Sequence, residues 1–445
     1  MAIETAERVQ AAPTKATFAA WATLGVLLLF YILSFLDRQI LAMMVDPIRR
    51  DLQIDDFRIS LLMGLSFAAL YTVFALLMGS VVDRYPRRLI VYAGVTLWSI
   101  STAACGLAAG FGHLFVARMA VGIGEATLVP ATYSMLSDVF PRRRLSLALA
   151  IFTLGTVLGA GLSMVVGGGV IALVSSMPPI DLPIFGATRA WQVVFLVIGL
   201  SGIPLALLIF AIAEPKRTGL LIGQDAKATS WRDAITFVRL RWKLWTAILL
   251  AFAPCSTLAN AVVLWGPSYM ARGFGWTPVQ IGTAIGLTVA TAGGAGQLFS
   301  GWYVDKLLAK GLPDAAFRYF GWSLTISIPS IVVAFLVPSP ALMLALIAIP
   351  FLVMFGNAGY VAAAIQMTTP NQFRGRMGGL FLLVVSIPGL VVGPSLIALL
   401  STNLFGSDKS LGYSIALCAV AFVPLMVSGV VLGRRAMSEL IAEAA

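Results

Sequence analysis

The chain has 445 residues, of which 59% are hydrophobic and 11% are charged, and its mean hydropathy is +0.95. This composition excludes an ordinary soluble enzyme and indicates a membrane protein with many spans. The formal net charge of +11 gives little support to a nucleic-acid partner, because membrane topology accounts for most of the cations.

Apolar runs long enough to cross about 30 Å of hydrocarbon occur twelve times along the chain. We therefore expect an all-α integral membrane protein with twelve transmembrane helices. The predicted spans are 20–45, 59–82, 89–110, 113–138, 145–173, 190–213, 243–271, 279–303, 318–337, 340–366, 377–402 and 411–433.

The loop charges predict the orientation. Of the 30 Lys and Arg residues, 22 fall in the two termini and the even-numbered loops, six fall in the odd-numbered loops, and two lie inside spans. Both termini are therefore expected on the cytoplasmic side. The sequence has no Asn-x-Ser/Thr sequon, which favours a bacterial source and hence the inner membrane. Cys105, Cys255 and Cys418 fall in separate spans and are expected to be free, buried thiols.

Four charged residues interrupt two of the apolar runs. Asp37 and Arg38 lie in the first span, and Arg118 and Glu125 lie in the fourth. Each unpaired charge near the middle of a bilayer costs roughly 2.5–3.5 kcal/mol, so such residues mark a polar functional site by default. The alternative is that Arg118 and Glu125 only lock the fourth helix to a neighbour.

Helical geometry brings these four residues to one region. The rise per residue places Asp37 and Glu125 at nearly the same depth, and Arg118 shares a helix face with Glu125. We expect one contact between Asp37 and Arg118 and another between Arg38 and Glu125, which exchange during turnover. Protonation of either carboxylate would release an arginine, so Asp37 and Glu125 are the candidate proton sites.

The two halves of the chain repeat each other. Gly79-Ser-Val-Val-Asp83-Arg84 follows the second span, and Gly301-Trp-Tyr-Val-Asp305-Lys306 follows the eighth. Two parallel six-helix bundles are expected, at residues 1–213 and 243–445. The 214–242 segment between them is predicted to be a cytoplasmic linker whose second part forms an amphipathic helix on the membrane surface, although a plain basic linker explains the composition equally simply.

Two motifs resemble signatures of the major facilitator superfamily. The first is Gly79-x-x-x-Asp83-Arg84-x-x-Arg87-Arg88, and the second is Arg118-x-x-x-Gly122-x-Gly124-Glu125, which that family associates with proton coupling. Together with Asp37-Arg38 in the first span, they resemble the spinster family. The resemblance implies a major facilitator fold of two pseudo-symmetric bundles, alternating access, and protons as the coupling ion with no other cofactor. The gate residues that it implies are Gly79, Asp83, Arg84, Arg87, Arg88, Gly301 and Asp305.

The last six spans carry no charged residue in their interiors. Their polar candidates for a cavity are Asn260, Tyr269, Asn357 and Tyr360. A cavity that is charged on one wall and apolar on the other suits a solute with a charged head and an apolar tail. It is about equally plausible that the second half is an inert scaffold.

We therefore expect a monomeric secondary transporter that moves an amphiphilic or lipid-like solute, of the lysophospholipid or sphingoid-phosphate type, by proton-coupled alternating access. Arg38 and Arg118 would bind the head group. One alternative is an organic-anion or sugar-acid proton symporter of the same fold, and another is a non-transporting membrane sensor. The sequence contains no nucleophile–base or metal-ligand constellation, so an enzyme is not expected. The expected partners are the substrate and membrane lipids.

Overall fold

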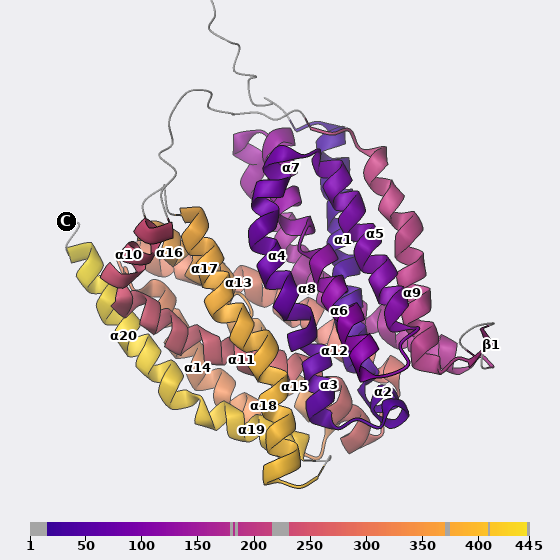
Figure 1. The fold of residues 1–445 in the computed structure, drawn as a ribbon. Coiled ribbons are helices and arrows are strands. Elements are labelled where there is room, and N and C mark those ends of the chain that lie inside the picture. Colours follow the sequence, from indigo (N-terminus) through magenta and orange to yellow (C-terminus); the bar gives the residue numbers. More distant parts are fainter. Residues whose placement is uncertain are drawn as a thin grey trace, which may run out of the picture.

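The computed structural model describes residues 16–178, 181–182, 186–215, 231–369, 374–407 and 410–442. Its helices form two groups that meet at one end and diverge toward the other (Figure 1). We call the diverging end, which carries the start of the first helix, the N-terminal face. The other end is called the opposite face. This wedge shape determines where the two halves of the chain touch.

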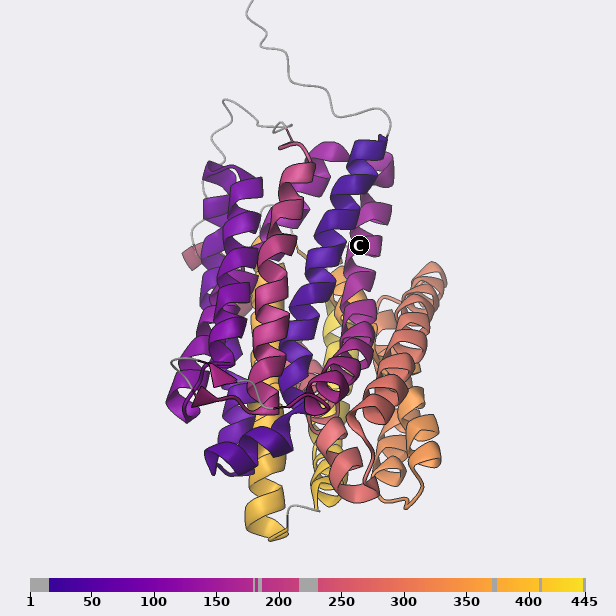
Figure 2. The same ribbon diagram turned by 90° about the vertical axis from the view of Figure 1, so that its right-hand side faces the viewer.

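The first half extends from the indigo to the magenta helices, and Figure 2 shows its long helices running side by side. Its helices are α1 (Phe18–Met43), α2 (Val45–Leu52), α3 (Asp56–Met63), α4 (Leu65–Arg84), α5 (Arg87–Cys105), α6 (Phe111–Glu125), α7 (Leu128–Val139), α8 (Arg142–Ser175), α9 (Ala190–Ala206) and the 3-10 helix η1 (Leu207–Ala211). Between α8 and α9, the two-residue strands β1 (Asp181–Leu182) and β2 (Gly186–Ala187) pair antiparallel.

The second half follows α10 (Trp231–Leu240), which lies at the N-terminal face where the sequence predicts a surface helix (Figure 1). Its helices are α11 (Trp242–Phe274), α12 (Pro278–Thr288), η2 (Val289–Gly293), α13 (Gly294–Ala309), α14 (Ala315–Ala334), α15 (Pro340–Met354), α16 (Asn357–Met367), α17 (Arg374–Ile387), η4 (Pro388–Val392), α18 (Gly393–Leu399), η5 (Leu400–Leu404), α19 (Leu411–Ala421) and α20 (Val423–Ala442).

Ten helical segments within the described residues are long and apolar enough to cross a membrane. The two further spans that the sequence predicts, 279–303 and 318–337, correspond to α12–η2–α13 and to α14. Taken alone, α12 and α13 have 11 and 16 residues, which is shorter than a bilayer crossing. Cys105, Cys255 and Cys418 are free and buried, as predicted.

Several predicted spans are interrupted. The fourth span breaks after Glu125 because of Pro130. Pro130 has no N–H group to donate to the carbonyl of the residue four positions earlier, and its ring would clash with that carbonyl in a continuous helix. The second span breaks at Gly64, where an added Cβ would lie 2.0 Å from the Leu390 main-chain oxygen of the other half. These breaks place Glu125 at a helix end and bring the halves together at Gly64.

The internal repeat holds in three dimensions. Gly155 and Gly159 of α8 face the side chains of α1, the first long helix of the first half. Gly389 of η4 and Gly393 of α18 face α11 in the same way, and α11 is the first long helix of the second half. The small residues therefore allow the equivalent pair of helices to pack closely in both bundles.

Candidate functional site

Arg38 and Glu125 form an ion pair between α1 and the end of α6. The Nε and Nη2 atoms of Arg38 each lie 2.5 Å from Oε2 of Glu125. The Glu125 side chain is fully buried, whereas that of Arg38 is 21% exposed. The predicted Arg38–Glu125 contact is present, and its arginine is the partner that a solute could reach.

Three aromatic rings surround the Arg38 guanidinium. Its Cζ atom lies 5.1 Å, 4.6 Å and 5.0 Å from the ring centroids of Phe35, Phe67 and Tyr71. Gly122 allows this arrangement, because a Cβ at that position would lie 2.6 Å from the Phe67 main-chain oxygen. Cation–π attraction therefore holds the guanidinium at the cavity edge even when Glu125 does not bind it.

Asp37 and Arg118 meet differently from the prediction. Nη1 of Arg118 donates a hydrogen bond of 2.9 Å to the main-chain oxygen of Asp37, not to its carboxylate. Arg118 therefore contacts the backbone of α1 at Asp37. Among the described residues, Oδ1 of Asp37 and Nε of Arg118 have no hydrogen-bond partner. A buried acid and a buried base thus remain incompletely paired, which is costly unless a proton or a solute binds there.

Two adjoining cavities lie beside these charges, between the two halves. The smaller, of about 220 Å³, is lined by Arg38 and Arg118 of the first half and by Asn260 of the second. The larger, of about 320 Å³, is lined mainly by apolar side chains of α11, α15 and α17. Both cavities share Phe35, Gln39, Ser256 and Asn260. Together they form a central site that is charged at one end and apolar at the other.

The predicted polar residues of the second half separate into three groups. Asn260 lines both compartments, and Asn357 lines the apolar one, where its Nδ2 atom lies 3.3 Å from the Cys255 sulfur. Tyr269 lines neither compartment, and its hydroxyl donates to the Phe335 main-chain oxygen at 3.2 Å near the opposite face. Tyr360 lines a separate cavity rather than the central site.

The sequence reasoning did not identify three residues that line the central site. Gln39 is polar and follows Asp37 by two positions within a span, which is a signal that could have identified it. Ser256 precedes Asn260 by one helical turn, so the two share a face of α11. Phe67 carries no such signal, because an aromatic residue in a span is ordinarily a packing residue.

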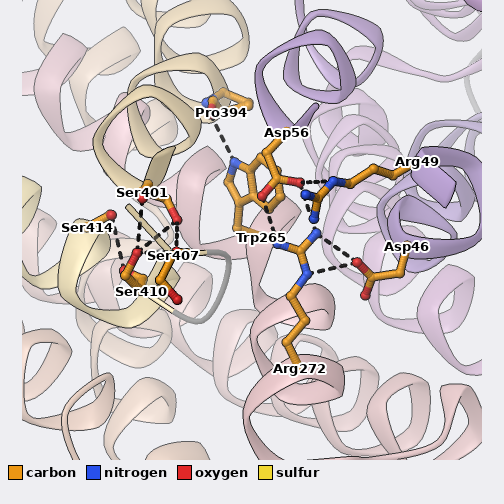
Figure 3. Close-up of polar contacts among 10 residues, drawn as sticks. All are labelled: Asp46, Arg49, Asp56, Trp265, Arg272, Pro394, Ser401, Ser407, Ser410 and Ser414. Carbon is orange, nitrogen blue, oxygen red and sulfur yellow. Dashed lines mark hydrogen bonds and ion pairs between the residues drawn. The ribbon is translucent and has the colours of Figure 1, made fainter. Parts of the chain in front are cut away.

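A second charged cluster joins the halves at the opposite face (Figure 3). Arg272, at the end of α11, lies 2.7 Å from Asp46 and 2.7 Å from Asp56. Two guanidinium nitrogens bind both carboxylate oxygens of Asp56, which is only 1% exposed. Arg49 reaches the same carboxylate at 3.6 Å. Because Asp46 and Asp56 belong to the first half, Arg272 is the cation that binds the two halves here.

Uncharged groups also join the two halves at the opposite face. The hydroxyls of Ser60 and Ser395 lie 3.2 Å apart across the interface. A Cβ at Gly161 would lie 2.6 Å from the Gly286 main-chain oxygen, so α8 and α12 pack backbone against backbone. The halves are therefore closed at the opposite face. The sequence did not identify Arg272, although it is one of six cations predicted on the side where positive charge is scarce.

Of the predicted gate residues at the N-terminal face, Gly79, Arg84, Gly301 and Asp305 make no described contact between the halves in this conformation. Among the described residues, nothing lies within 4 Å of a Cβ built at Gly79 or at Gly301. Arg84 and Asp305 are exposed, and the side chain of Asp83 lies outside the described residues. The reason is the divergence of the two bundles at this face, which separates the helix ends that carry the motif (Figure 1).

The sequence profile described as the Major Facilitator Superfamily matches residues 27–394. The chain belongs to the Major Facilitator Superfamily. Its relatives are transporters and not enzymes. The profile covers the first half, with all four buried charges, and the second half as far as α18.

Individual relatives of this superfamily member are similar over most of its length. An MFS-type efflux pump of Mycolicibacterium smegmatis is 26% identical over 392 residues, which cover 86% of this chain and 85% of the pump. The hexuronate transporter of Bacillus subtilis is 25% identical over 373 residues, covering 82% of this chain and 84% of that protein. Protein spinster of Drosophila melanogaster is 29% identical over 318 residues, and the chain spans about half of its length, 49%.

A solved structure shares the fold of this carrier. The crystal structure of a bacterial homolog to the human lysosomal transporter Spinster, in an inward-facing and unoccupied conformation, matches with a TM-score of 0.81. It is 22% identical and covers 96% of this chain and 99% of that one. The predicted twelve-helix fold and the predicted spinster resemblance are confirmed.

Arg87, one of the predicted gate residues, bonds within the first half of the carrier in this conformation. Its buried side chain bonds to Asp138 of α7 and, at 3.1 Å, to Glu214 after η1. The main-chain N–H groups of Arg87 and Arg88 also donate to Glu214. A carboxylate at a helix N-terminus is stabilised by the free N–H groups and by the helix dipole. The basic end of this motif therefore joins α5 to α7 and to the segment after η1, all within one bundle.

The second half contains a similar cluster with the charges reversed. Asp314, before α14, accepts hydrogen bonds from Arg318 at 2.6 Å and from Arg434 of α20 at 2.9 Å. Although burial opposes ionisation of Asp314, these two bonds outweigh it and lower the pKa of its carboxyl below the ordinary value. Because the folded-state pKa is lowered, the stabilisation is present at neutral pH and is lost as the pH falls through that pKa.

We predict that Asp314→Asn destabilises the carrier at pH 7 by about 1.5–3 kcal/mol, the usual value for hydrogen bonds to a charged group. The difference from the wild type should shrink in acid, where Asp314 of the wild type is itself protonated. Thermal unfolding in detergent between pH 7 and pH 3 measures this. A difference that stays constant over that range would show that the charge of Asp314 is not responsible.

Proposed function

We propose that this chain is a proton-coupled secondary transporter of an amphiphilic anion that has one apolar tail. The observation that carries the proposal is the central site, which has two arginines at one end and an apolar compartment of about 320 Å³ at the other. The anionic head group would lie against Arg38 and Arg118, and the tail would lie among the side chains of α11, α15 and α17. Ligand sites of this kind combine a few placed polar groups with an apolar lining.

The Arg38–Glu125 pair supplies a mechanism for proton coupling. Arg38 is partly exposed to the cavity while Glu125 is buried, so an entering anion competes with Glu125 for the guanidinium. Loss of that partner would leave a buried carboxylate uncompensated, and proton uptake removes the cost. Anion binding and protonation of Glu125 would therefore favour each other, which is the reciprocal linkage that coupled transport requires. Asp37, also incompletely paired, is the second proton site in this proposal.

Sidedness follows from the charge distribution. If the N-terminal face is cytoplasmic, as the positive-inside rule predicts, the carrier is closed toward the exterior and open toward the cytoplasm. The Arg272 cluster would then be the external gate. When the carrier opens outward, the two halves would approach each other at the N-terminal face. The gate residues Gly79 and Arg84 of the first half would then come close to Gly301 and Asp305 of the second. A monomer in a bacterial inner membrane remains part of the proposal.

A second candidate is a sugar-acid symporter, and similarity to the Bacillus subtilis hexuronate transporter favours it. The two arginines would bind a carboxylate equally well. However, most of the lining of the larger compartment is apolar, so sugar-acid hydroxyls beyond the reach of its few polar side chains would lack hydrogen-bond partners, which costs about 1–3 kcal/mol for each buried group. The amphiphile therefore fits the whole site better than the sugar acid does.

The proposal is tested with purified protein in liposomes that carry an imposed pH gradient. Labelled lysophospholipids, sphingoid phosphates and hexuronates are offered in parallel, and exchange is measured without a gradient. Gradient-driven accumulation of a single-tailed amphiphile supports the proposal. Accumulation of hexuronate alone supports the second candidate, and absence of both uptake and exchange with all substrates, from folded protein that still binds one of them, supports a sensor.

We predict that Val385→Trp discriminates between tail lengths. Val385 lines the apolar compartment, so a larger side chain there should reduce the space for the tail and weaken binding of long-chain substrates by about tenfold, or 1.4 kcal/mol, while affecting short-chain substrates less. Val392→Trp is the matched control, because Val392 is 46% exposed and does not line the central site. Competition binding with an acyl-chain series measures both. Equal loss for every chain length would contradict a tail in this compartment.

A further inference from the structure

A cavity of about 460 Å³ lies outside the central site and shares no lining residue with it. Its first wall is the part of α8 between Leu147 and Leu154. Its other walls are formed by α13, α14, α16 and α20 of the second half. Apolar side chains dominate the lining, and its volume is within the ordinary range for ligand sites. The proposed transport function does not use this cavity.

The cavity lies where α8 and the α12–α13 helix separate. From the opposite face upward these helices touch successively at Gly168 and Pro278, at Gly161 and Gly286, and at Val157 and Gly293. Beyond Gly293 they part, and the cavity occupies the space between them. Gly301, with open space around its Cβ position, and Asp305 line it. The cavity is thus the unclosed continuation of an interface between the two halves.

Exposed apolar side chains lie at the rim of the cavity. Leu147 and Leu298 belong to its lining, yet their side chains are 52% and 70% exposed, so hydrocarbon can enter between them. Trp302, which is 57% exposed on the same end of α13, is a residue type that favours the membrane interface. A lipid chain can therefore reach the cavity from the side without passing through the central site.

The polar groups in and beside the cavity indicate which kind of molecule would bind there. Tyr360 lines the cavity and is only 5% exposed, and among the described residues its hydroxyl has no hydrogen-bond partner. Such a group needs an acceptor. The exposed Lys306 and Lys310 at the end of α13 place positive charge beside the cavity, and Lys306 lies 5.1 Å from the Trp302 ring. Asp305 is the one opposing charge on the lining of the cavity described here.

We propose that this cavity binds one acyl chain of an anionic membrane phospholipid, which acts as a wedge between the halves. The chain would occupy the apolar space, an ester carbonyl would accept the Tyr360 hydroxyl proton in a hydrogen bond, and the phosphate would lie near Lys306 and Lys310. Closing the N-terminal face requires α13 to approach α8, so the bound chain must leave first. Anionic lipid therefore stabilises the conformation that is open at the N-terminal face and slows the closing of that face.

The test is native mass spectrometry of the full-length protein with phosphatidylglycerol and, separately, with phosphatidylcholine. Gly359→Leu puts a side chain into the cavity, where Gly359 has open space, and should reduce retained phosphatidylglycerol by tenfold or more. Gly25→Leu is the matched control, because Gly25 is also an exposed helical glycine with open space but lies on α1. Tyr360→Phe should lower retention by a smaller factor. Lys306→Gln with Lys310→Gln should abolish the preference for the anionic lipid.

Equal retention in the Gly359 and Gly25 variants would overturn the cavity assignment. No preference for phosphatidylglycerol in the wild type would overturn the anionic head group. Displacement of the lipid by a transported substrate would show that the cavity belongs to the transport path, and would overturn the wedge. Spin-label distances across the N-terminal face should lengthen when phosphatidylglycerol replaces phosphatidylcholine, and a constant distance would also contradict the wedge. Apart from the displacement by substrate, these readouts do not depend on the proposed substrate class.

Discussion

Replacing Glu125 with glutamine is expected to reduce gradient-driven uptake by about tenfold or more while leaving substrate exchange in place. Glutamine has nearly the same shape and can still accept a hydrogen bond from Arg38, but it cannot take up and release a proton. The buried ion pair at 2.5 Å would be lost. Removing one partner of a buried pair can cost about 3–5 kcal/mol of folding free energy because it leaves an uncompensated charge, but glutamine keeps a hydrogen bond to Arg38. Folding should therefore survive, because the three aromatic rings still stabilise Arg38.

Glu439→Gln is the matched control for this prediction. Glu439 pairs with Lys243 at 2.8 Å, but both side chains are about half exposed, at 53% and 47%. Exposed ion pairs contribute about 0–1 kcal/mol, so uptake should change less than twofold or so. Uptake and exchange are measured in the same liposomes with and without a pH gradient. If Glu125→Gln keeps gradient-driven accumulation while Asp37→Asn loses it, the proton site is Asp37, and the role of Glu125 is structural.

The second large effect is expected at Arg272. Arg272→Gln removes the cation that holds Asp46 and Asp56 of the first half against α11 of the second (Figure 3). Loss of one partner from a buried, hydrogen-bonded charge pair costs about 2–5 kcal/mol. Here Asp46 loses its bond to Arg272, and Asp56 keeps the more distant Arg49 at 3.6 Å. Even 2 kcal/mol shifts an equilibrium between two conformations by about thirtyfold. The variant should therefore populate the conformation that is open at the opposite face.

Cysteine accessibility measures this shift. Ser395→Cys places a thiol beside Ser60 in the closed interface, and the three native cysteines are buried. A membrane-impermeant maleimide should label this thiol slowly in an otherwise wild-type background and faster when Arg272→Gln is added. Arg189→Gln is the control, because Arg189 pairs with Asp51 at 3.7 Å within the first half and both are partly exposed. Equal labelling in both variants would show that Arg272 does not hold the gate closed.

The two predictions concern opposite ends of one cycle. Glu125 lies beside the central site, where a solute and a proton would bind, while Arg272 keeps the opposite face closed. In alternating access, binding at the centre must change the balance between the two gates. The Glu125 variant should therefore alter coupling without opening the opposite face, and the Arg272 variant should alter the conformational balance without removing the central charges. Measuring both quantities in both variants separates coupling from gating.

The sequence predicted the membrane class, the internal repeat and the four buried charges, because these follow from local composition. A charge in an apolar run is visible without any knowledge of the fold, since its cost in a bilayer is large wherever the helix lies. The segments 79–84 and 301–306 indicated the repeat, because the same pattern of glycine, aspartate and a cation follows the second and the eighth span. The contact between Arg38 and Glu125 was accessible from depth and helical phase.

Only the tertiary structure decided which groups meet. Depth and phase could not tell that Arg118 bonds to the main chain of Asp37 rather than to its carboxylate, because that depends on the distance between the two helix axes. Tyr269 and Tyr360 looked equivalent to Asn260 in the sequence, yet rotation of each helix turned them away from the central site. The Arg272 cluster joins residues more than 200 positions apart, at |i−j| of 216 and 226. The local sequence pattern determines which residues cost free energy in a bilayer, whereas the packing of the two halves determines which of these residues become partners.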